Sequence, residues 1–187
     1  MKALEVHLAS RGPGCDAAPM LIRDATETDA EAIAGIYAHH VLTGTASYDL
    51  EPPGAELHRE KIRSVREAGW PYLVAEEGGN LAGYAYATQM RPRAAYRFTA
   101  EDSIYVHPDW MRRGVGRALL EMLLQRSSDC GFGTMIAVIG GAEPASIGLH
   151  SALGFREVGR LKAVGFKFGR WLDSVYMQRD LPTAGGD

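Results

Sequence analysis

Two glycines and three arginines stand at the start of an apolar segment, in the sequence HPDWMRRGVGRALLEMLL of residues 107–124. Val115, Leu119 and Leu123 recur at helical spacing, which predicts a helix that begins near the glycines. The first N–H groups of a helix have no intrahelical partner, and the helix dipole makes that end partly positive. Glycine lets a ligand approach the backbone closely. The stretch therefore predicts a site for phosphate or pyrophosphate.

Two other phosphate-binding motifs do not fit this stretch. A Walker loop requires Lys and then Ser or Thr after its last glycine, whereas Arg117 and Ala118 follow Gly116. The dinucleotide fingerprint requires a third glycine, and Leu119 stands at that position. The structural alternative is a glycine turn that only connects a strand to a helix.

The composition of the chain is that of an ordinary globular domain. It has 187 residues, of which 46% are hydrophobic and 23% charged, and its formal net charge is −3 with a pI of about 6.1. This balance gives no general basic field for nucleic acid, and no apolar run is long enough to span a membrane. Cys15 and Cys130 lack metal-site spacing and suit a reducing compartment. We therefore expect a cytoplasmic protein with no metal, nucleic-acid or membrane partner.

Both ends of the chain are expected to be tails. Residues 1–19 contain Gly-Pro-Gly and lack the uninterrupted apolar core of a signal peptide, so we expect a flexible and dispensable N-terminal tail. Residues 183–187 are expected to form a short C-terminal tail. Residues 20–182 then form a single domain, because no linker or internal repeat divides them.

Strand and helix patterns alternate along this domain. Strands are expected at 21–25, at 72–90 as a hairpin that turns at Glu77–Asn80, at 101–108, at 133–141, and over 155–181 with a loop around Gly165–Trp171. Helices are expected after a capping box of Thr26 and Asp29, around Leu57, Ile62 and Val65, from Val115, and at 143–154. The order predicts a mixed α/β fold, in which a sheet carries helices on its faces.

The sequence RRGVGR, placed after SIYVHP and before an apolar helix, resembles the pyrophosphate loop of the GNAT superfamily of acetyl-CoA-dependent N-acetyltransferases. The resemblance extends over roughly residues 20–182. It is strongest to the phosphinothricin and methionine sulfoximine acetyltransferases, through the segments GTASYDLEP, RAAYRFTAEDSIYVHP, HSALGF and GFKFGRWLDSVYMQRDL. It implies the GNAT fold, in which a mostly antiparallel central sheet is splayed at the cofactor site, and it implies a homodimer.

The resemblance also implies where acetyl-CoA binds. Ile104, Tyr105 and Val106 would lie along its pantetheine arm. The pyrophosphate would lie against the loop residues Arg112, Arg113, Gly114, Val115, Gly116 and Arg117.

Two positions depart from the family pattern. Met111 stands where Gln or Arg usually opens the pyrophosphate loop, and Glu143 stands where Asn often contacts the cofactor arm. The first change should leave phosphate binding intact, because backbone N–H groups make most of it. The second brings an acid near a polyanion, which puts one cofactor contact in doubt.

Acetyl transfer from a thioester to an amine needs a neutral amine, donors for the developing oxyanion and a proton for the departing thiolate. By resemblance, Glu101 is the base and His150 is a catalytic partner. Partial burial would raise the pKa of Glu101 toward the useful range. His150 could protonate the thiolate or serve as the base itself, and either residue could instead be structural. A backbone N–H near Tyr105 or Val106 is expected to stabilise the oxyanion.

The resemblance places Arg93, Ala94, Ala95 and Tyr96 at the substrate. An arginine there can bind carboxylate, phosphinate or sulfoximine oxygens, and Arg91 and Arg97 are nearby alternatives to Arg93. The predicted reaction is acetylation of the α-amine of a small amino-acid analogue such as phosphinothricin or methionine sulfoximine. The alternatives are another amine (a polyamine, an aminoglycoside or a protein N-terminus) or a non-catalytic acyl-CoA-binding regulator.

Overall fold

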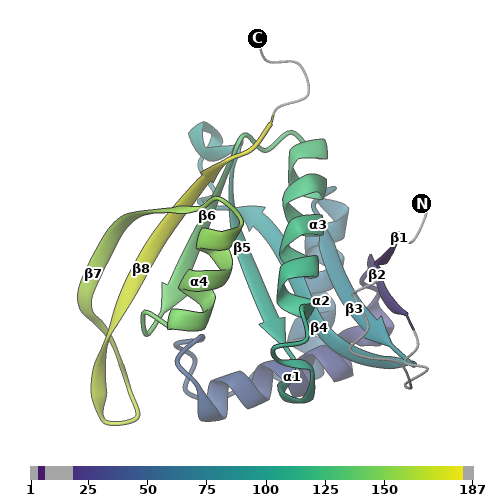
Figure 1. Cartoon of the computed structure of the whole chain (residues 1–187), viewed down its shortest axis with the longest axis horizontal. Coiled ribbons are helices and arrows are strands. Elements are labelled where there is room, and N and C mark those ends of the chain that lie inside the picture. The colour runs from purple at the N-terminus through teal and green to yellow at the C-terminus, as the bar shows by residue number, and fades with distance from the viewer. Residues whose placement is uncertain (1–3, 7–18, 183–187) are drawn as a thin grey trace.

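The computed structural model describes residues 4–6 and 19–182, which form one sheet with helices on both faces (Figure 1). The strands are β1 (Leu4–Val6), β2 (Met20–Asp24), β3 (Tyr72–Glu77), β4 (Asn80–Gln89), β5 (Thr99–Val106), β6 (Thr134–Gly140), β7 (Arg156–Lys167) and β8 (Arg170–Asp180). The helices are α1 (Ala30–Thr43), α2 (Ala55–Glu67), α3 (Val115–Asp129) and α4 (Pro144–Ala152). The three single turns of 3-10 helix are Glu27–Asp29, Ala94–Tyr96 and Pro108–Trp110.

The sheet has eight strands in the order β1-β2-β3-β4-β5-β6-β8-β7. Every neighbouring pair is antiparallel except β5 and β6, which are parallel. The mixed α/β architecture predicted from the sequence is therefore confirmed.

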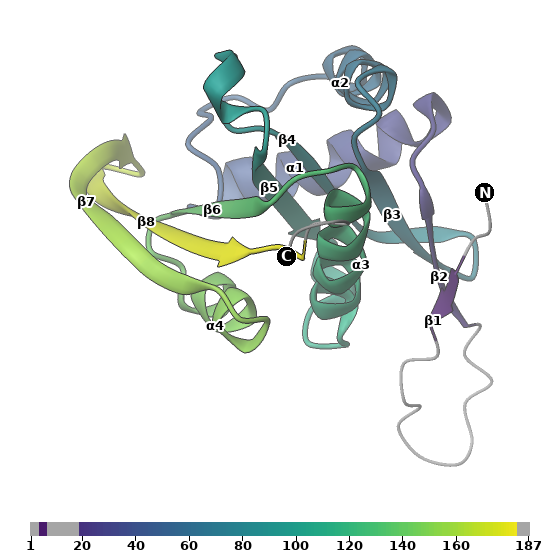
Figure 2. The ribbon, with the colours of Figure 1, turned by 90° about the horizontal axis from the view of Figure 1, so that it is seen from above.

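Helices cover both faces of the sheet (Figure 2). α3 and α4 cover one face, where Leu119, Leu120 and Leu123 of α3 are fully buried in the larger core cluster. α1 and α2 cover the other face, where Ile33 and Ile62 are fully buried in the smaller cluster. The spacing of three and four residues between the α3 leucines explains why that helix buries one face.

The two central strands separate halfway along their length. β5 pairs with β6 at only three positions, the last of which joins Glu101 to Ile136. β5 nevertheless continues to pair with β4 as far as Val106, and β6 with β8 as far as Gly140. The splayed sheet that the sequence implied is thus present, and the separation begins directly after Glu101.

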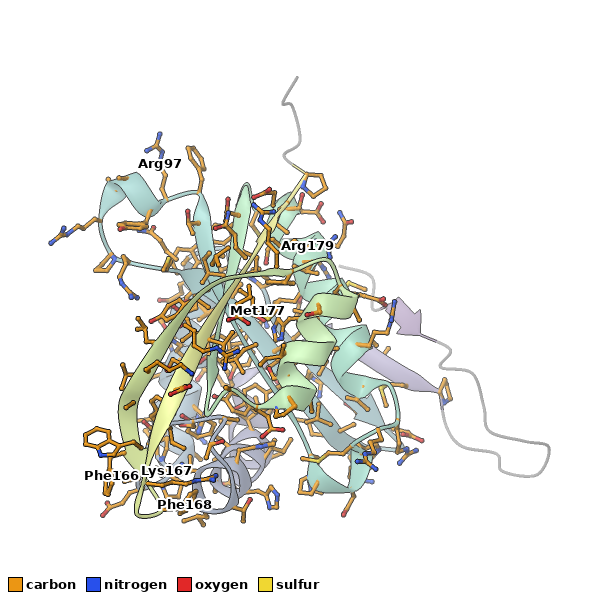
Figure 3. The ribbon with its side chains drawn as sticks, turned by 60° about the vertical axis from the view of Figure 1, so that its left-hand side comes forward. Arg97, Phe166, Lys167, Phe168, Met177 and Arg179 are labelled. Carbon is orange, nitrogen blue, oxygen red and sulfur yellow. The ribbon has the colours of Figure 1, made fainter. Side chains whose placement is uncertain are left out.

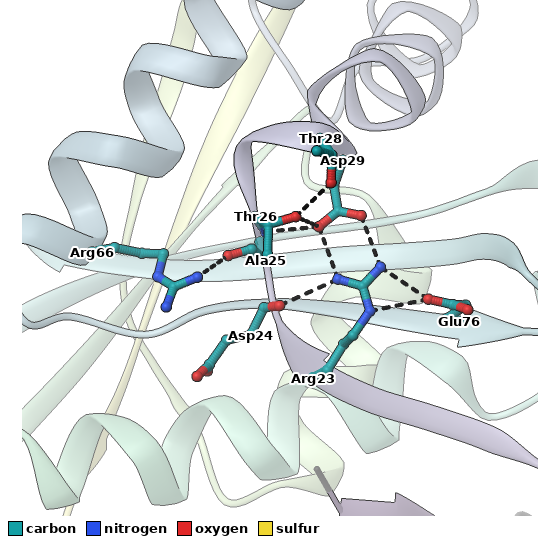
Figure 4. Close-up of polar contacts among 8 residues, drawn as sticks. All are labelled: Arg23, Asp24, Ala25, Thr26, Thr28, Asp29, Arg66 and Glu76. Carbon is teal, nitrogen blue, oxygen red and sulfur yellow. Dashed lines mark hydrogen bonds and ion pairs between the residues drawn. The ribbon is translucent and has the colours of Figure 1, made fainter. Parts of the chain in front are cut away.

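The capping box expected before the first helix is present (Figure 4). The backbone N–H of Thr26 donates to Oδ2 of Asp29 over 2.7 Å. Arg23 of β2 also donates to both carboxylate oxygens of Asp29, over 2.8 Å each. This buried carboxylate therefore joins β2 to the start of α1.

The loop that the sequence predicts around Gly165–Trp171 is reduced to a tight turn in the structure. β7 continues through Lys167, and a two-residue turn at Phe168 and Gly169, with φ values of 51° and 71°, leads directly into β8. In α2, Ile62 and Val65 are buried as expected, but Leu57 is 60% exposed.

Most of the two predicted tails lies outside the described residues. Within the first of them, Leu4–Val6 form β1, which pairs with β2 at the edge of the sheet. These three residues are thus part of the sheet, where the sequence indicated a flexible tail. The dispensability of residues 1–19 stays a prediction. No helix among the described residues is long and apolar enough to cross a membrane.

Candidate active site

A cavity of about 480 Å³ opens where β5 and β6 separate. Its walls come from five parts of the chain: residues 101–105 of β5, residues 137–140 of β6, residues 143–150 around α4, the loop at 46–48, and the β7–β8 hairpin. Backbone pairing between β5 and β6 ends at Glu101, and the cavity lies beyond this point, between the two strands.

The cavity has access to both faces of the sheet. Successive side chains of a strand point to opposite faces. Asp102 is bonded to His150 of α4 on one face, whereas the Tyr105 ring contacts Tyr37 of α1 on the other. Glu101 therefore lies on the α1 side, opposite His150. The two predicted catalytic residues both line the cavity, but from opposite sides of β5.

Glu101 lies at the separation point, where its carboxylate is partly exposed to the cavity. Its side chain is 33% exposed, and Nη1 of Arg91 lies 3.9 Å from its Oε2. Burial raises the pKa of Glu101 above its ordinary value, Arg91 opposes this shift, and the neighbouring charge of Asp102 adds to it. A carboxylate with a raised pKa accepts a proton more readily near neutral pH.

His150 is buried and fully engaged by hydrogen bonds. Its Nε2 lies 2.9 Å from Oδ2 of Asp102, and its Nδ1 lies 2.7 Å from the carbonyl oxygen of Ser146. The side chains of His150 and Asp102 are only 3% and 1% exposed. Asp102 is not among the residues predicted from the sequence; the signal for it is the alternation of a strand, which turns the residue after Glu101 to the other face.

The predicted phosphate loop leads into α3 with an unusual backbone. Gly114 at the helix start has φ 85°, and Arg112 has φ 60°. Gly116 lies beside β5 and α4, because a Cβ there would be 3.5 Å from Val106 and 3.4 Å from Leu149. The first N–H groups of α3 are therefore presented at the end of β5.

The arginines of this loop differ in their partners. Nη2 of Arg113 lies 2.8 Å from Oε1 of Glu77, and Nε of Arg117 lies 2.8 Å from Oε1 of Glu121. Arg112 has no carboxylate partner within the described part of the chain. Two of the three cations are thus partly neutralised by neighbouring carboxylates.

Two further residues named from the sequence have local roles in the structure. Glu143 lines the cavity and caps α4, accepting a hydrogen bond of 3.5 Å from the N–H of Ala145. The carbonyl of Val106 is already bonded to Nε2 of His40, 2.8 Å away. Ile104 and Tyr105 also line the cavity, and the backbone of Tyr105 faces β4, as the bond from the N–H of His107 to the carbonyl of Ala82 in the same register indicates.

The predicted substrate segment does not line the cavity of this chain. Arg93, Ala94, Ala95 and Tyr96 form an exposed turn before β5. Figure 3 shows the next residue, Arg97, pointing outward at the end of the molecule away from the tip of the β7–β8 hairpin. Arg91, which the sequence offered only as an alternative, is the arginine beside Glu101.

The loop after α1 is held against the β7–β8 hairpin. Tyr48 donates a hydrogen bond to the carbonyl of Asp173 over 2.7 Å, and its hydroxyl accepts one from the N–H of Gly141 over 3.1 Å. Nζ of the buried Lys167, at the hairpin tip in Figure 3, donates to the carbonyl of Ser47 over 2.8 Å. These contacts fix one wall of the cavity, and no pattern in the sequence predicts them.

Glycine at position 165 makes room for this loop. A Cβ on Gly165 would lie 2.6 Å from Cε2 of Tyr48. We expect Gly165→Ala to lower the free energy of unfolding by about 1–3 kcal/mol, as overpacking usually does. Gly159→Ala in the same strand is the matched control, because a Cβ there meets nothing within 4 Å. Urea denaturation of both variants would measure the free energies of unfolding. Equal values would show that the Tyr48 ring can move aside without loss of stability.

Comparison with known proteins bears on this arrangement. A family model described as an acetyltransferase (GNAT) domain matches residues 22–176. The chain is 53% identical over 161 residues to the phosphinothricin N-acetyltransferase of Alcaligenes faecalis, covering 86% of this chain and 82% of that protein. It is 39% identical over 162 residues to the L-methionine sulfoximine/L-methionine sulfone acetyltransferase of Salmonella typhimurium, covering 87% and 95%.

A solved structure is similar over nearly the whole chain. The crystal structure of a GNAT superfamily phosphinothricin acetyltransferase from Sinorhizobium meliloti, in complex with AcCoA, matches with a TM-score of 0.84 and 46% identity. The match covers 91% of this chain and 95% of that one.

Proposed function

The chain belongs to the GNAT family of acetyltransferases, and we propose that it transfers the acetyl group of acetyl-CoA to the α-amine of phosphinothricin or methionine sulfoximine. Relatives that match most of the chain are acetyltransferases of these two compounds. The observation that carries the proposal is the cavity at the separation of β5 and β6, with the half-buried Glu101 on its wall.

The residues of the cavity suit acetyl-CoA, which supplies an acetyl group activated as a thioester. Beyond Glu101, no described strand pairs with β5 on its β6 side, so alternate backbone N–H and C=O groups can pair with the amides of the pantetheine arm. We assign the backbone pairing to Ile104 and to the N–H of Val106, and Tyr105 would contact the arm through its side chain, because its own backbone faces β4. The α3 start, with residues 112–117, lies at the end of this edge and offers free N–H groups to the pyrophosphate.

Glycine 114 provides a test of this assignment. We expect Gly114→Asp to weaken acetyl-CoA binding, because it adds a negative charge at the helix start where the pyrophosphate would lie. Gly114→Asn is the matched control, since its side chain has nearly the same shape as that of Asp and a similar tolerance of φ 85° but carries no charge. Titration calorimetry with acetyl-CoA on folded protein measures the difference. Equal affinities of the two variants would contradict the site.

The chemical steps follow from the positions of the side chains. Glu101 accepts a proton from the substrate ammonium, directly or through water, which frees the nitrogen lone pair for attack on the thioester carbonyl. A backbone N–H near Tyr105 or Val106 donates to the oxyanion that forms. When the C–S bond breaks, the acetyl group stays on the substrate nitrogen as an amide, and the excess proton that this nitrogen loses passes through water to the departing thiolate of CoA.

The proposed reaction is tested by measuring the release of free thiol from acetyl-CoA with a panel of amines. Phosphinothricin and methionine sulfoximine are expected to react, and spermidine, an aminoglycoside and a peptide N-terminus serve as the competing classes. Release with another amine would keep the enzyme and change its substrate. Tight acetyl-CoA binding with no release for any amine would favour a non-catalytic regulator.

A homodimer is the proposed assembly, and apolar side chains on the β7–β8 hairpin support it. Six are exposed: Val158, Leu161, Val164, Phe166, Phe168 and Trp171. Phe166 and Phe168 lie at the hairpin tip (Figure 3). Exposed apolar clusters of this kind often mark protein interfaces. Light scattering of the wild type and of Trp171→Asp would test the assembly.

A cytoplasmic location is proposed as well, in keeping with the exposed free thiol of Cys130.

A further inference from the structure

Both ring nitrogens of His150 face hydrogen-bond acceptors. The carbonyl oxygen of Ser146 can only accept, so Nδ1 carries a proton there. The carboxylate of Asp102, 2.9 Å from Nε2, also accepts. A ring that donates from both nitrogens is an imidazolium, which has no lone pair left to take a proton from a substrate.

The surroundings of the pair favour this charged form. Oδ1 of Asp102 is buried and has no hydrogen-bond partner among the described residues, so the adjacent cation is what compensates the buried carboxylate. Burial alone would lower the pKa of His150, but the hydrogen bond and charge of Asp102 outweigh it and the pKa is raised. The other groups on the ring are the Ser146 hydroxyl, 3.4 Å from Nδ1, and the Phe155 ring, which meets it edge to face.

Asp102 and His150 lie where the pairing of β5 with β6 ends. Asp102 is the first residue of β5 beyond the last pairing with β6. His150 belongs to α4, which follows β6 in the chain after a short turn. The bond between them thus ties the unit of β6 and α4 back to β5, where these two strands diverge around the cavity.

We propose that Asp102 and His150 form a buried ion pair that braces α4 against β5 and sets the opening between β5 and β6, so that both are positioning residues for the reaction. This inference rests on the proposed acetyl transfer. It assigns to Asp102 a role that the sequence did not reveal. It leaves proton abstraction from the amine to Glu101 on the other face of the strand.

Replacement of Asp102 by Asn separates bracing from proton transfer. The Asn amide can donate to Nε2 of a neutral His150, whose Nδ1 still donates to Ser146, so the brace persists without charge. We expect kcat/KM within roughly tenfold of wild type, since the geometry is kept. In a catalytic dyad, where the carboxylate orients and activates the histidine, Asp→Asn costs about 10⁴-fold. A loss of that size with the wild-type fold would overturn the proposal.

Asp102→Ala and His150→Gln complete the series. Asp102→Ala removes the brace, and we expect a higher KM for acetyl-CoA and a loss in kcat/KM of roughly 10²-fold, the scale of a misplaced site. His150→Gln cannot transfer a proton but can still donate to Asp102, so kcat should persist with the acid limb of its pH profile unchanged. A His150→Gln variant that lost this limb along with its activity would show that His150 transfers the proton.

The protonation state can be read without any reaction. Nitrogen-15 NMR of the resting protein is expected to show His150 protonated on both ring nitrogens at pH 7, and protonated on one in Asp102→Asn. A neutral His150 ring in the wild type would contradict the ion pair. Because this measurement needs no substrate, it stands even if none of the tested amines is acetylated, and it thereby separates this inference from the proposed function.

Discussion

Replacing Glu101 by Gln is expected to lower kcat/KM by roughly 10²–10⁴-fold, the usual contribution of a general base. The amide keeps the size of the side chain and its place on the cavity wall, so the loss would report the missing proton acceptor. Initial rates of thiol release at fixed acetyl-CoA measure the effect. Wild-type rates in the variant at neutral pH would remove Glu101 from the mechanism.

The pH dependence of kcat/KM is a second test of Glu101 as the base. The base works in its ionised form, so activity is present above the pKa of Glu101 and is lost as the pH falls through it. Because burial raises this pKa, the acid limb of kcat/KM should lie above the ordinary range of a glutamate. In Glu101→Gln this limb should vanish, and the remaining rate should grow toward high pH, where more of the substrate amine is free. Glu101→Asp, which keeps the charge but shortens its reach, should retain the limb at a lower rate.

Features encoded by neighbouring residues could be predicted from the sequence. The helix start at Gly114 depends on local glycine and apolar spacing, and the β3–β4 hairpin depends on the glycines between Glu77 and Asn80. The strand that carries Glu101 was recognisable for the same reason. The separation of β5 from β6 came only through the family resemblance, because no local pattern states where a ladder ends.

Features that depend on distant contacts could not be predicted in this way. The glycine at position 165 favours a loop by its residue type, yet it lies within β7, where the Tyr48 ring occupies the space that a side chain would take. Asp102 and His150 are 48 positions apart, and only the packing of α4 on β5 brings them together. The basic loop contains several arginines, and its path in space decides that Arg91, rather than Arg93, meets Glu101.

Because Arg91 rather than Arg93 lies beside Glu101, we expect Arg91 to affect the choice of substrate. Arg91→Ala should lower kcat/KM for phosphinothricin and methionine sulfoximine by roughly ten- to hundredfold, because one charge-assisted hydrogen bond contributes about 1.5–3 kcal/mol. The guanidinium lies 3.9 Å from the Glu101 carboxylate that must receive the amine proton. A substrate whose amine meets Glu101 therefore brings its α-carboxylate or its polar head within reach of Arg91.

Arg93→Ala is the matched control, since Arg93 belongs to the same exposed loop but, unlike Arg91, has no ion pair with Glu101 among the described residues. Its loss should be the smaller of the two. Spermidine should be acetylated far more slowly than either amino-acid analogue, because its cations would face Arg91. Arg91→Ala should narrow that gap by slowing the analogues while leaving spermidine unchanged or faster. A larger effect of Arg93→Ala would move the substrate site to the exposed turn. If the wild-type enzyme preferred spermidine, the proposal of an amino-acid substrate would be wrong, since Arg91 would then have no substrate anion to bind. The acetyltransferase fold and the role proposed for Glu101 would be unaffected by that result.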